Sequence, residues 1–203
     1  MVIVMQKKND TEHYTDELIL ELRRKYRQAQ LDTQERAEQG LQEVSLYDGL
    51  CTIGLPVSMY DMEPWKRSVK YRGRTQPDVV ITDENADATF TFSYAGQMAE
   101  GEKPEQRLEN LRADMQKVWK QAVFYDTGMV MAGDLPVPWM DCKTFCLDCS
   151  LYCLLFLFEL QGELVLGNFH CSFPQYDKWK PVVLEVLETI ETKGGRNDER
   201  LSD

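Results

Sequence analysis

The chain has 203 residues, of which 28% are charged, and a formal net charge of -11. Its length suits one domain with a sizeable core. Because nucleic acids and anionic membranes bind cationic surfaces, the acidic balance disfavours both as partners.

The N-terminus gives no indication of export. The apolar run from Met1 to Met5 is short for a signal peptide, and neither a basic start nor a small-residue cleavage site accompanies it. No apolar stretch is long enough to span a bilayer, since Leu154 to Phe158 amounts to one strand. We therefore expect a cytoplasmic protein whose six cysteines are free thiols rather than disulfides.

A long helix is predicted from Tyr14 to Gln39. Leu18, Leu22 and Tyr26 mark an apolar edge in its first half, whereas its second half is nearly all polar. The apolar edge does not continue as a heptad, so the pattern does not indicate a coiled coil.

Two hairpins are predicted next. Val44 to Tyr47 and Leu50 to Leu55 flank Asp48-Gly49, which is a favoured two-residue turn. The second hairpin joins Val79 to Thr82 with Ala88 to Tyr94.

The segment between these hairpins, from Met59 to Gln76, has no regular pattern but gathers basic residues in an acidic chain. Its aromatic and basic side chains are of kinds found in binding hot spots, and the predicted partner-binding site consists of Trp65, Lys66, Arg67, Tyr71, Arg72 and Arg74. An edge strand whose Lys and Arg residues prevent unwanted pairing would show the same alternation. Both interpretations stay open from the sequence.

An amphipathic helix is predicted to begin at about Pro104. Its apolar residues recur on one face: Leu108, Leu111, Met115, Val118, Trp119 and Ala122. A strand from Val123 to Met131 follows, with Asp126-Thr127-Gly128 inside it.

The most informative stretch runs from Trp139 to Ile190. Three apolar runs with short polar breaks predict an antiparallel meander: Trp139 to Leu147, Leu151 to Glu159 and Leu164 to Phe173. The middle strand should be the most buried, because its apolar residues fall on both faces. The spacing then becomes helical, with Asp177 as a candidate N-cap and Trp179, Val183 and Val186 on the apolar face.

These elements predict an α/β (α+β) fold, a three-layer α/β/α sandwich around a mostly antiparallel sheet with an extra long N-terminal helix. A two-layer α+β arrangement is the alternative. In this interpretation residues 1–43 form an N-terminal helical extension, residues 44–192 a single domain and residues 193–203 a polar tail.

Several local features occur in a recognisable order: Leu55-Pro56, Pro77, the middle amphipathic helix, Gly162, Phe169-His170-Cys171, and a last helix with Trp179, Lys180 and Pro181. With this order the chain resembles a bacterial member of the PsbP/Mog superfamily from Val44 to Ile190. The resemblance implies an antiparallel-sheet sandwich used as a binding module, as in an extrinsic photosystem subunit, a Ran-binding protein and chaperone-like proteins of secretion effectors. It implies no catalytic residues, and the long N-terminal helix departs from the usual start.

The spacing of Cys142, Cys146 and Cys149 matches the three-cysteine motif of radical-SAM iron–sulfur enzymes. Those enzymes need a large barrel after the motif, whereas only a meander and one helix remain here. A thioredoxin-like pair would need a helix N-terminus, and a zinc site that includes Cys153 would need a longer loop between two cysteine pairs. We therefore interpret these cysteines as structural thiols and predict no metal and no cofactor.

The two histidines, His13 and His170, form no recognisable catalytic pattern. His170 and Cys171 are adjacent on a predicted strand and point to opposite faces, so only a more distant cysteine could pair with His170. Nucleophile-elbow, phosphate-loop and dinucleotide motifs do not occur in the sequence. We predict no catalytic residues and a non-enzymatic protein-binding, adaptor or chaperone-like module. The alternative is a thiol- or metal-dependent enzyme that uses the cysteines from Cys142 to Cys153.

Overall fold

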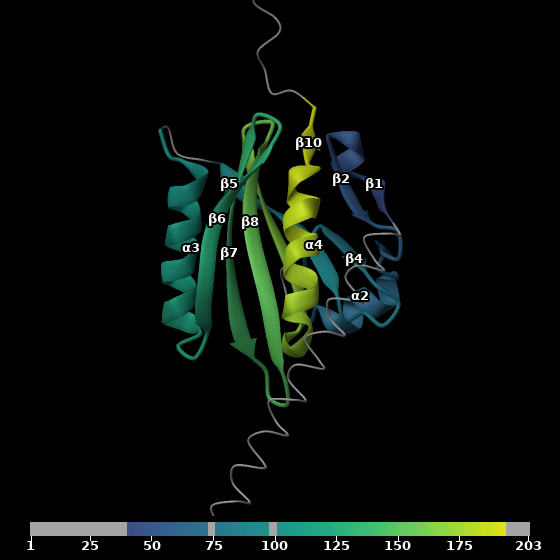
Figure 1. Ribbon diagram of the computed structural model, residues 1–203, viewed down its shortest axis with the longest axis vertical. Coiled ribbons are helices and arrows are strands. Elements are labelled where there is room, and N and C mark those ends of the chain that lie inside the picture. The colour runs from purple at the N-terminus through teal and green to yellow at the C-terminus, as the bar shows by residue number, and fades with distance from the viewer. Residues whose placement is uncertain (1–39, 73–75, 98–100, 194–203) are drawn as a thin grey trace, which may run out of the picture.

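The computed structural model describes residues 40–72, 76–97 and 101–193. This part of the chain folds as an α+β domain with two antiparallel sheets and three α-helices (Figure 1). The predicted α+β class and the antiparallel pairing of its strands are thereby confirmed. The predicted helix from Tyr14 to Gln39 lies outside the described residues, as does almost all of the polar tail.

The larger sheet has seven strands in the order β3-β4-β5-β9-β8-β7-β6. Its strands are β3 (Tyr60–Asp61), β4 (Val79–Thr82), β5 (Thr89–Gln97), β6 (Val123–Ala132), β7 (Leu135–Phe145), β8 (Ser150–Leu160) and β9 (Glu163–Ser172). In the β8–β9 hairpin, Gln161 and Gly162 both have positive φ, 54° and 85°, as a tight two-residue turn requires. The pairing confirms the predicted hairpin of β4 and β5 and the predicted meander of β7, β8 and β9.

A smaller sheet has three strands in the order β1-β2-β10. Its strands are β1 (Leu41–Leu46), β2 (Cys51–Pro56) and β10 (Glu191–Thr192). β1 and β2 form the predicted first hairpin, but their last pair is Leu46 and Cys51, so the connection has the four residues Tyr47 to Leu50 and is not the predicted two-residue Asp48-Gly49 turn. The Thr189 hydroxyl accepts a 2.7 Å hydrogen bond from the Gly54 main-chain N–H and donates one of 2.6 Å to the Val186 carbonyl. These bonds connect the small sheet to the end of the last helix.

The described helices are α2 (Pro64–Lys70), α3 (Pro104–Val118) and α4 (Tyr176–Glu188), with 3-10 turns η1 (Tyr47–Gly49) and η2 (Phe173–Gln175). Within the described ranges, none of these helices combines the length and the apolar character needed to cross a bilayer.

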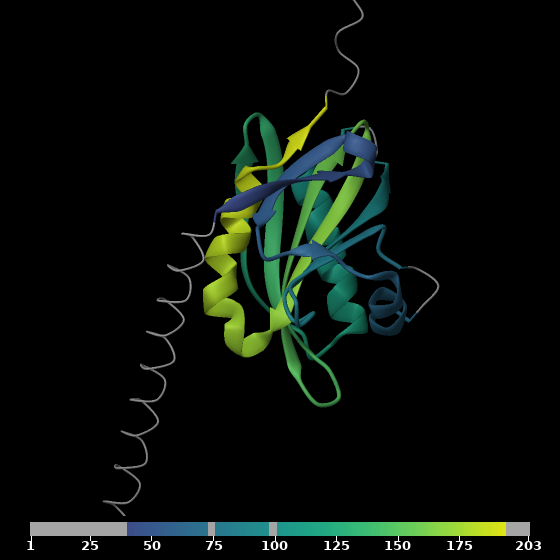
Figure 2. The same ribbon diagram turned by 90° about the vertical axis from the view of Figure 1, so that its right-hand side faces the viewer.

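Alternation along β8 divides the core into two parts. Leu154, Phe156 and Phe158 are fully buried on one face, together with apolar residues of α4 and the small sheet. Leu155 and Leu157 point to the opposite face and belong to the cluster beneath α3. Figure 2 shows α4 and α3 on opposite sides of the larger sheet. The prediction of a largely buried strand inside the sheet, with the helices around Met115 and Val186 both resting on the sheet, is confirmed.

Helix α2 corrects two interpretations of the segment between the hairpins. Pro64 occupies its first turn, and Trp65 and Val69 follow one helical turn apart. The segment from Trp65 to Lys70 is therefore neither irregular nor an edge strand. Seven residues are too few for a helical period to stand out from the sequence.

Three predicted boundaries also differ from the structure. α3 ends at Val118 because Trp119 leaves helical geometry at φ -110° and ψ 73°, so Trp119 and Ala122 do not continue its apolar face. Asp177 lies inside the first turn of α4, and the N-cap is Gln175. β1 begins at Leu41, whereas the first strand was predicted to begin at Val44.

Candidate functional site

A cavity of about 680 Å³ lies on the α3 face of the larger sheet. α3 rests on β7 and β8, so β5 and β9 form the part of this face that the helix leaves to the cavity. The walls come from the end of α3, the segment before β6, the β7–β8 hairpin and Pro77. The lining residues are Pro77, Thr91, Ser93, Met115, Trp119, Gln121, Ala122, Thr144, Phe145, Cys146, Leu151, Cys153, Leu155, Leu166, Asn168 and His170.

None of these lining residues is Asp, Glu, Lys or Arg, although 28% of the chain is charged. Met115, Leu155 and Leu166 supply apolar surface, and Trp119 and Phe145 add aromatic rings at the opening. A concave, mostly apolar site with a few polar groups is the usual form of a ligand pocket. The cavity is therefore suited to binding uncharged groups.

Asn168 contributes a polar atom without a partner. Its side-chain Oδ1 is buried and accepts no hydrogen bond, although most buried polar atoms in folded proteins are paired. The nearby Thr91 hydroxyl donates its proton, over 3.3 Å, to the main-chain carbonyl of Asn168 and not to the side chain. Asn168 thus brings an unpaired acceptor to the residues that line the cavity.

His170 lies in the same wall and is neutral at physiological pH. Burial, together with the positive charge of Lys70, lowers the pKa of His170 to about 3. Its Nε2 lies 3.5 Å from the hydroxyl of Tyr71, the residue that follows α2. This contact places the end of α2 beside the cavity.

The structure brings two cysteines together beneath α3. Cys142 and Cys153 are partners across β7 and β8, and Cys153 also lies opposite His170 on β9. The pKa of Cys142 is raised by its hydrogen bond to Cys153 and by burial. That same hydrogen bond lowers the pKa of Cys153 against the opposing effect of burial, and Thr144 adds a second bond. The Cys153 thiol hydrogen-bonds to Cys142 and Thr144, whereas the His170 ring contacts Tyr71.

Cys146 and Cys149 close the β7–β8 hairpin, where the Cys146 N–H donates a 2.9 Å hydrogen bond to the Cys149 carbonyl. Both thiols are free and exposed. A hairpin turn lacks the helix N-terminus that activates the thiol in redox motifs of the same spacing. Among residues 40–72, 76–97 and 101–193, no three His, Cys, Asp or Glu side chains are grouped as metal ligands would be.

The predicted partner-binding residues are divided by the structure. Trp65 and Arg72 are exposed, and Lys66 lies 3.3 Å from Glu63. The Arg67 guanidinium instead donates hydrogen bonds to the main-chain carbonyls of Pro77 and Asp78, which holds α2 to the chain before β4. Tyr71 faces His170, and Arg74 lies outside the described residues. Arg67 and Tyr71 are thus positioned by packing, while Trp65 and Arg72 remain on the surface.

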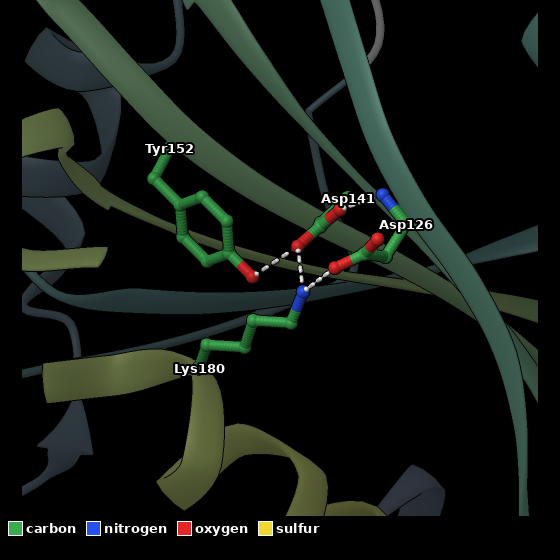
Figure 3. Close-up of polar contacts among 4 residues, drawn as sticks. All are labelled: Asp126, Asp141, Tyr152 and Lys180. Carbon is green, nitrogen blue, oxygen red and sulfur yellow. Dashed lines mark hydrogen bonds and ion pairs between the residues drawn. The ribbon is translucent and has the colours of Figure 1, made fainter. Parts of the chain in front are cut away.

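A second polar cluster lies on the opposite face of the sheet, under α4 (Figure 3). Lys180 Nζ lies 2.6 Å from Asp126 Oδ2 and 2.7 Å from Asp141 Oδ2, and the Tyr152 hydroxyl donates to Asp141 over 2.9 Å. Asp141 also accepts a 2.7 Å bond from the Asp126 N–H. Burial and the neighbouring Asp141 raise the pKa of Tyr152. Every buried charge in this cluster has a partner of opposite charge. We therefore assign the cluster a structural role, which is to attach α4 to the sheet.

Apart from Cys146 and Cys153, which belong to the alternative thiol- or metal-dependent enzyme, sequence reasoning assigned no residue of the cavity wall to a site. One signal was present, because polar residues alternate along both strands of its floor: Thr89, Thr91 and Ser93 on β5, and Asn168 and His170 on β9. That these two strands pair, with Thr89 opposite His170, depends on contacts between distant parts of the chain. From the sequence alone, this alternation of polar residues would have predicted a sheet face exposed to solvent.

No protein-family profile and no curated protein sequence matches the chain. Solved structures do. Cyanobacterial PsbP (CyanoP) from Synechocystis sp. PCC 6803 is 11% identical with a TM-score of 0.57, covering 76% of this chain and 94% of that one. LpqN from Mycobacterium tuberculosis is 10% identical with a TM-score of 0.50, covering 79% and 95%. A Bacteroides thetaiotaomicron protein is 13% identical with a TM-score of 0.51, covering 77% and 49%. At such identities the likeness establishes a PsbP-like fold and nothing about activity.

Proposed function

We propose that this chain is a non-enzymatic protein-binding module of the adaptor or chaperone-like kind. The observation that carries the proposal is that exposed apolar side chains gather at the rim of the cavity and on α2, whose following residue Tyr71 contacts His170 in the cavity wall. Exposed apolar groups that cluster around a concavity mark interaction surfaces, whereas scattered ones do not. Within this proposal we keep the three-layer α/β/α description and the cytoplasmic location as predictions.

One side of this surface is the rim formed by the end of α3 and the β7–β8 hairpin. Its exposed members are Val118, Trp119, Phe145 and Leu147. Trp119 and Phe145 also line the cavity, so the rim continues into its opening. Aromatic residues in such positions are the side chains that dominate binding energy at protein interfaces.

The other side is α2, which presents Trp65 and Val69 to solvent and is followed by exposed Arg72. The segment from Trp65 to Arg72 contains four basic and no acidic residues in a chain with a net charge of -11, and Lys66 pairs with Glu63. A partner that presents apolar side chains beside acidic ones would complement both sides at once. Nucleic acids and membranes remain disfavoured by the overall charge.

The alternative, a thiol-dependent enzyme, is supported by the position of Cys153 opposite His170 in a cavity. A thiolate is activated by an adjacent base or cation. Here the imidazole contacts Tyr71 and the thiol contacts Cys142 and Thr144. This geometry favours the binding role.

Site-specific cross-linking tests the proposal. A photo-reactive phenylalanine analogue is placed at Trp65 or Trp119, and in a matched control at Val57, which is exposed in the loop after β2. We expect the same host protein to be captured from positions 65 and 119, as identified by mass spectrometry, and not from position 57. Equal capture from all three positions would contradict the assignment.

Charge reversal then tests the basic side. A Lys66→Glu, Arg72→Glu double variant should lose affinity for that protein, and wild-type binding should weaken as ionic strength rises, because exposed charge pairs are screened beyond a Debye length of about 10 Å at 0.1 M. If the double variant binds that protein with wild-type affinity, α2 is not part of the binding surface.

A further inference from the structure

We propose that the cavity on the α3 face binds an uncharged, largely apolar small molecule that donates a hydrogen bond to the side-chain oxygen of Asn168. This binding site goes beyond the proposed protein-binding surface, since it lies in the interior that the rim surrounds. The two roles are tested separately below.

The size and the lining of the cavity define the apolar part of the ligand. A volume of about 680 Å³ falls within the range of about 300–1,000 Å³ that is common for small-molecule sites. Leu155, Leu166 and Met115 come from the floor and from α3, so apolar side chains meet the ligand from two directions. Apolar surface buried between them gains the usual free energy of removal from water.

The lining also defines the charge of the ligand. Among the residues that the structure describes, none that lines the cavity could neutralise an ion, since no Asp, Glu, Lys or Arg is one of them and His170 is uncharged. Lys70, whose charge acts on His170, donates its protons to the Ala86 carbonyl and the Thr89 hydroxyl, and Arg67 donates to the main-chain carbonyls of Pro77 and Asp78. Placing a carboxylate or ammonium group in the cavity would cost its hydration without a compensating partner.

The unpaired atom defines the polar part of the ligand. Asn168 Oδ1 is buried and without a hydrogen bond. The Thr91 hydroxyl donates its hydrogen bond to the Asn168 main-chain carbonyl and not to the side chain. An acceptor left unpaired in the interior is costly, and a bound donor removes this cost. One N–H or O–H group on an apolar ligand therefore matches what the wall offers.

Three related dyes separate these requirements. N-phenyl-1-naphthylamine is uncharged and carries one N–H donor, 1-anilinonaphthalene-8-sulfonate adds a negative charge to the same skeleton, and the N-methyl derivative of the first lacks the donor. Fluorescence titration of the full chain should show saturable binding of the first dye. We expect binding at least about ten-fold weaker for the sulfonate and about five-fold weaker for the N-methyl derivative, the fold-change of one ordinary hydrogen bond.

Matched variants locate the binding. Ser93→Trp places a large ring in the cavity wall at a half-buried position that tolerates it, and Ser45→Trp places the same ring on exposed β1. The first should abolish dye binding and the second should leave it unchanged. Asn168→Leu should remove the preference for the N–H dye over its N-methyl derivative while the protein stays at least as stable, because an unpaired polar atom is lost.

Equal affinity for the sulfonate and the uncharged dye, or full binding by Ser93→Trp, would overturn the site. A donor preference that survives in Asn168→Leu would overturn the role of Asn168. The Lys66→Glu, Arg72→Glu variant keeps this cavity intact, so it should bind the dye normally even where it no longer binds the protein partner. The failure of one proposal is therefore distinguishable from the failure of the other.

Discussion

Gly167 on β9 lies directly opposite Phe156 on β8 at the centre of the larger sheet. A Cβ atom built at Gly167 would overlap the ring of Phe156, so the glycine provides the space in which the ring lies. The ring is fully buried and packs edge-on against Phe92, with centroids 6.0 Å apart. An aromatic ring placed over a strand glycine in this way also fixes the register of the two strands.

This pairing gives the first prediction. Phe156→Ala should lower the free energy of unfolding by about 3–5 kcal/mol, as expected for a large core aromatic. Gly167→Ala alone should cost about 1–3 kcal/mol through overpacking. Because the truncated ring leaves room for the new methyl group, the double variant should be less destabilised than the sum of the two. Urea unfolding of the four proteins measures this, and strictly additive costs would show that the two positions do not share space.

Helix α4 is attached by an ion-pair cluster as well as by its apolar face. Lys180 reaches Asp126 and Asp141, and Asp141 is almost fully buried. Burial by itself lowers the pKa of Lys180, but its hydrogen bonds to the two carboxylates outweigh this, and the pKa is raised. The ammonium group therefore stays charged in the fold.

The second prediction follows from removing that charge. Lys180→Met should destabilise the protein by about 2–4 kcal/mol, because Asp141 would remain buried without its cation. Lys117→Met on α3 is a matched control, since its 2.8 Å pair with Asp114 is exposed on both sides. An exposed pair contributes about 0–1 kcal/mol at most. Similar unfolding free energies for the two variants would mean that the cluster under α4 does not depend on its charge.

The cysteines of the β7–β8 hairpin give the third prediction. Cys149→Ser changes an exposed thiol and should leave the unfolding free energy within about 0.5 kcal/mol of wild type. Cys142→Ser should cost about 1–3 kcal/mol, because Cys142 is fully buried against Cys153 and beneath α3. Neither variant should change the metal content measured by elemental analysis. Loss of bound zinc or of a visible absorption band in either variant would favour the metal-dependent alternative.

The sequence predicted the elements whose patterns are long and local. The run from Leu164 to Phe173 shows its alternation over ten residues, and α4 shows an apolar face over three turns, so both agree with the structure. α2 has seven residues and ends before a periodic pattern can build up. The apolar face of α3 was extended too far because Val118 and Trp119 keep the helical spacing in the sequence while Trp119 leaves the helix. The cavity depends on β5 pairing with β9 across distant parts of the chain, which no local pattern contains.

The two faces of the larger sheet limit stability at opposite ends of the pH scale. Under α4, the raised pKa values of Lys180 and Tyr152 mean that their contributions are present below the ordinary values of about 10–10.5 and are lost at higher pH. On the α3 face, the lowered pKa of His170 means that the free energy of unfolding falls as the pH falls below the ordinary value of 6.5. The molecule should therefore be most stable between the two ranges.

The last prediction concerns the acidic limit. His170 has a pKa of about 3 in the fold and an ordinary value of 6.5, so between these pH values the unfolded chain binds a proton that the folded chain does not. The free energy of unfolding must then fall as pH falls from 6.5 towards 3. Between pH 7 and pH 5 the wild-type protein should lose about 2 kcal/mol more than His170→Gln, which has no imidazole to titrate. The carboxylates are common to both proteins and cancel in this comparison. Urea unfolding at the two pH values measures the difference, and NMR of the His170 ring at pH 5 should show the neutral form. An equal loss in both proteins, or a ring that titrates near 6.5, would place His170 in water and not in the cavity wall.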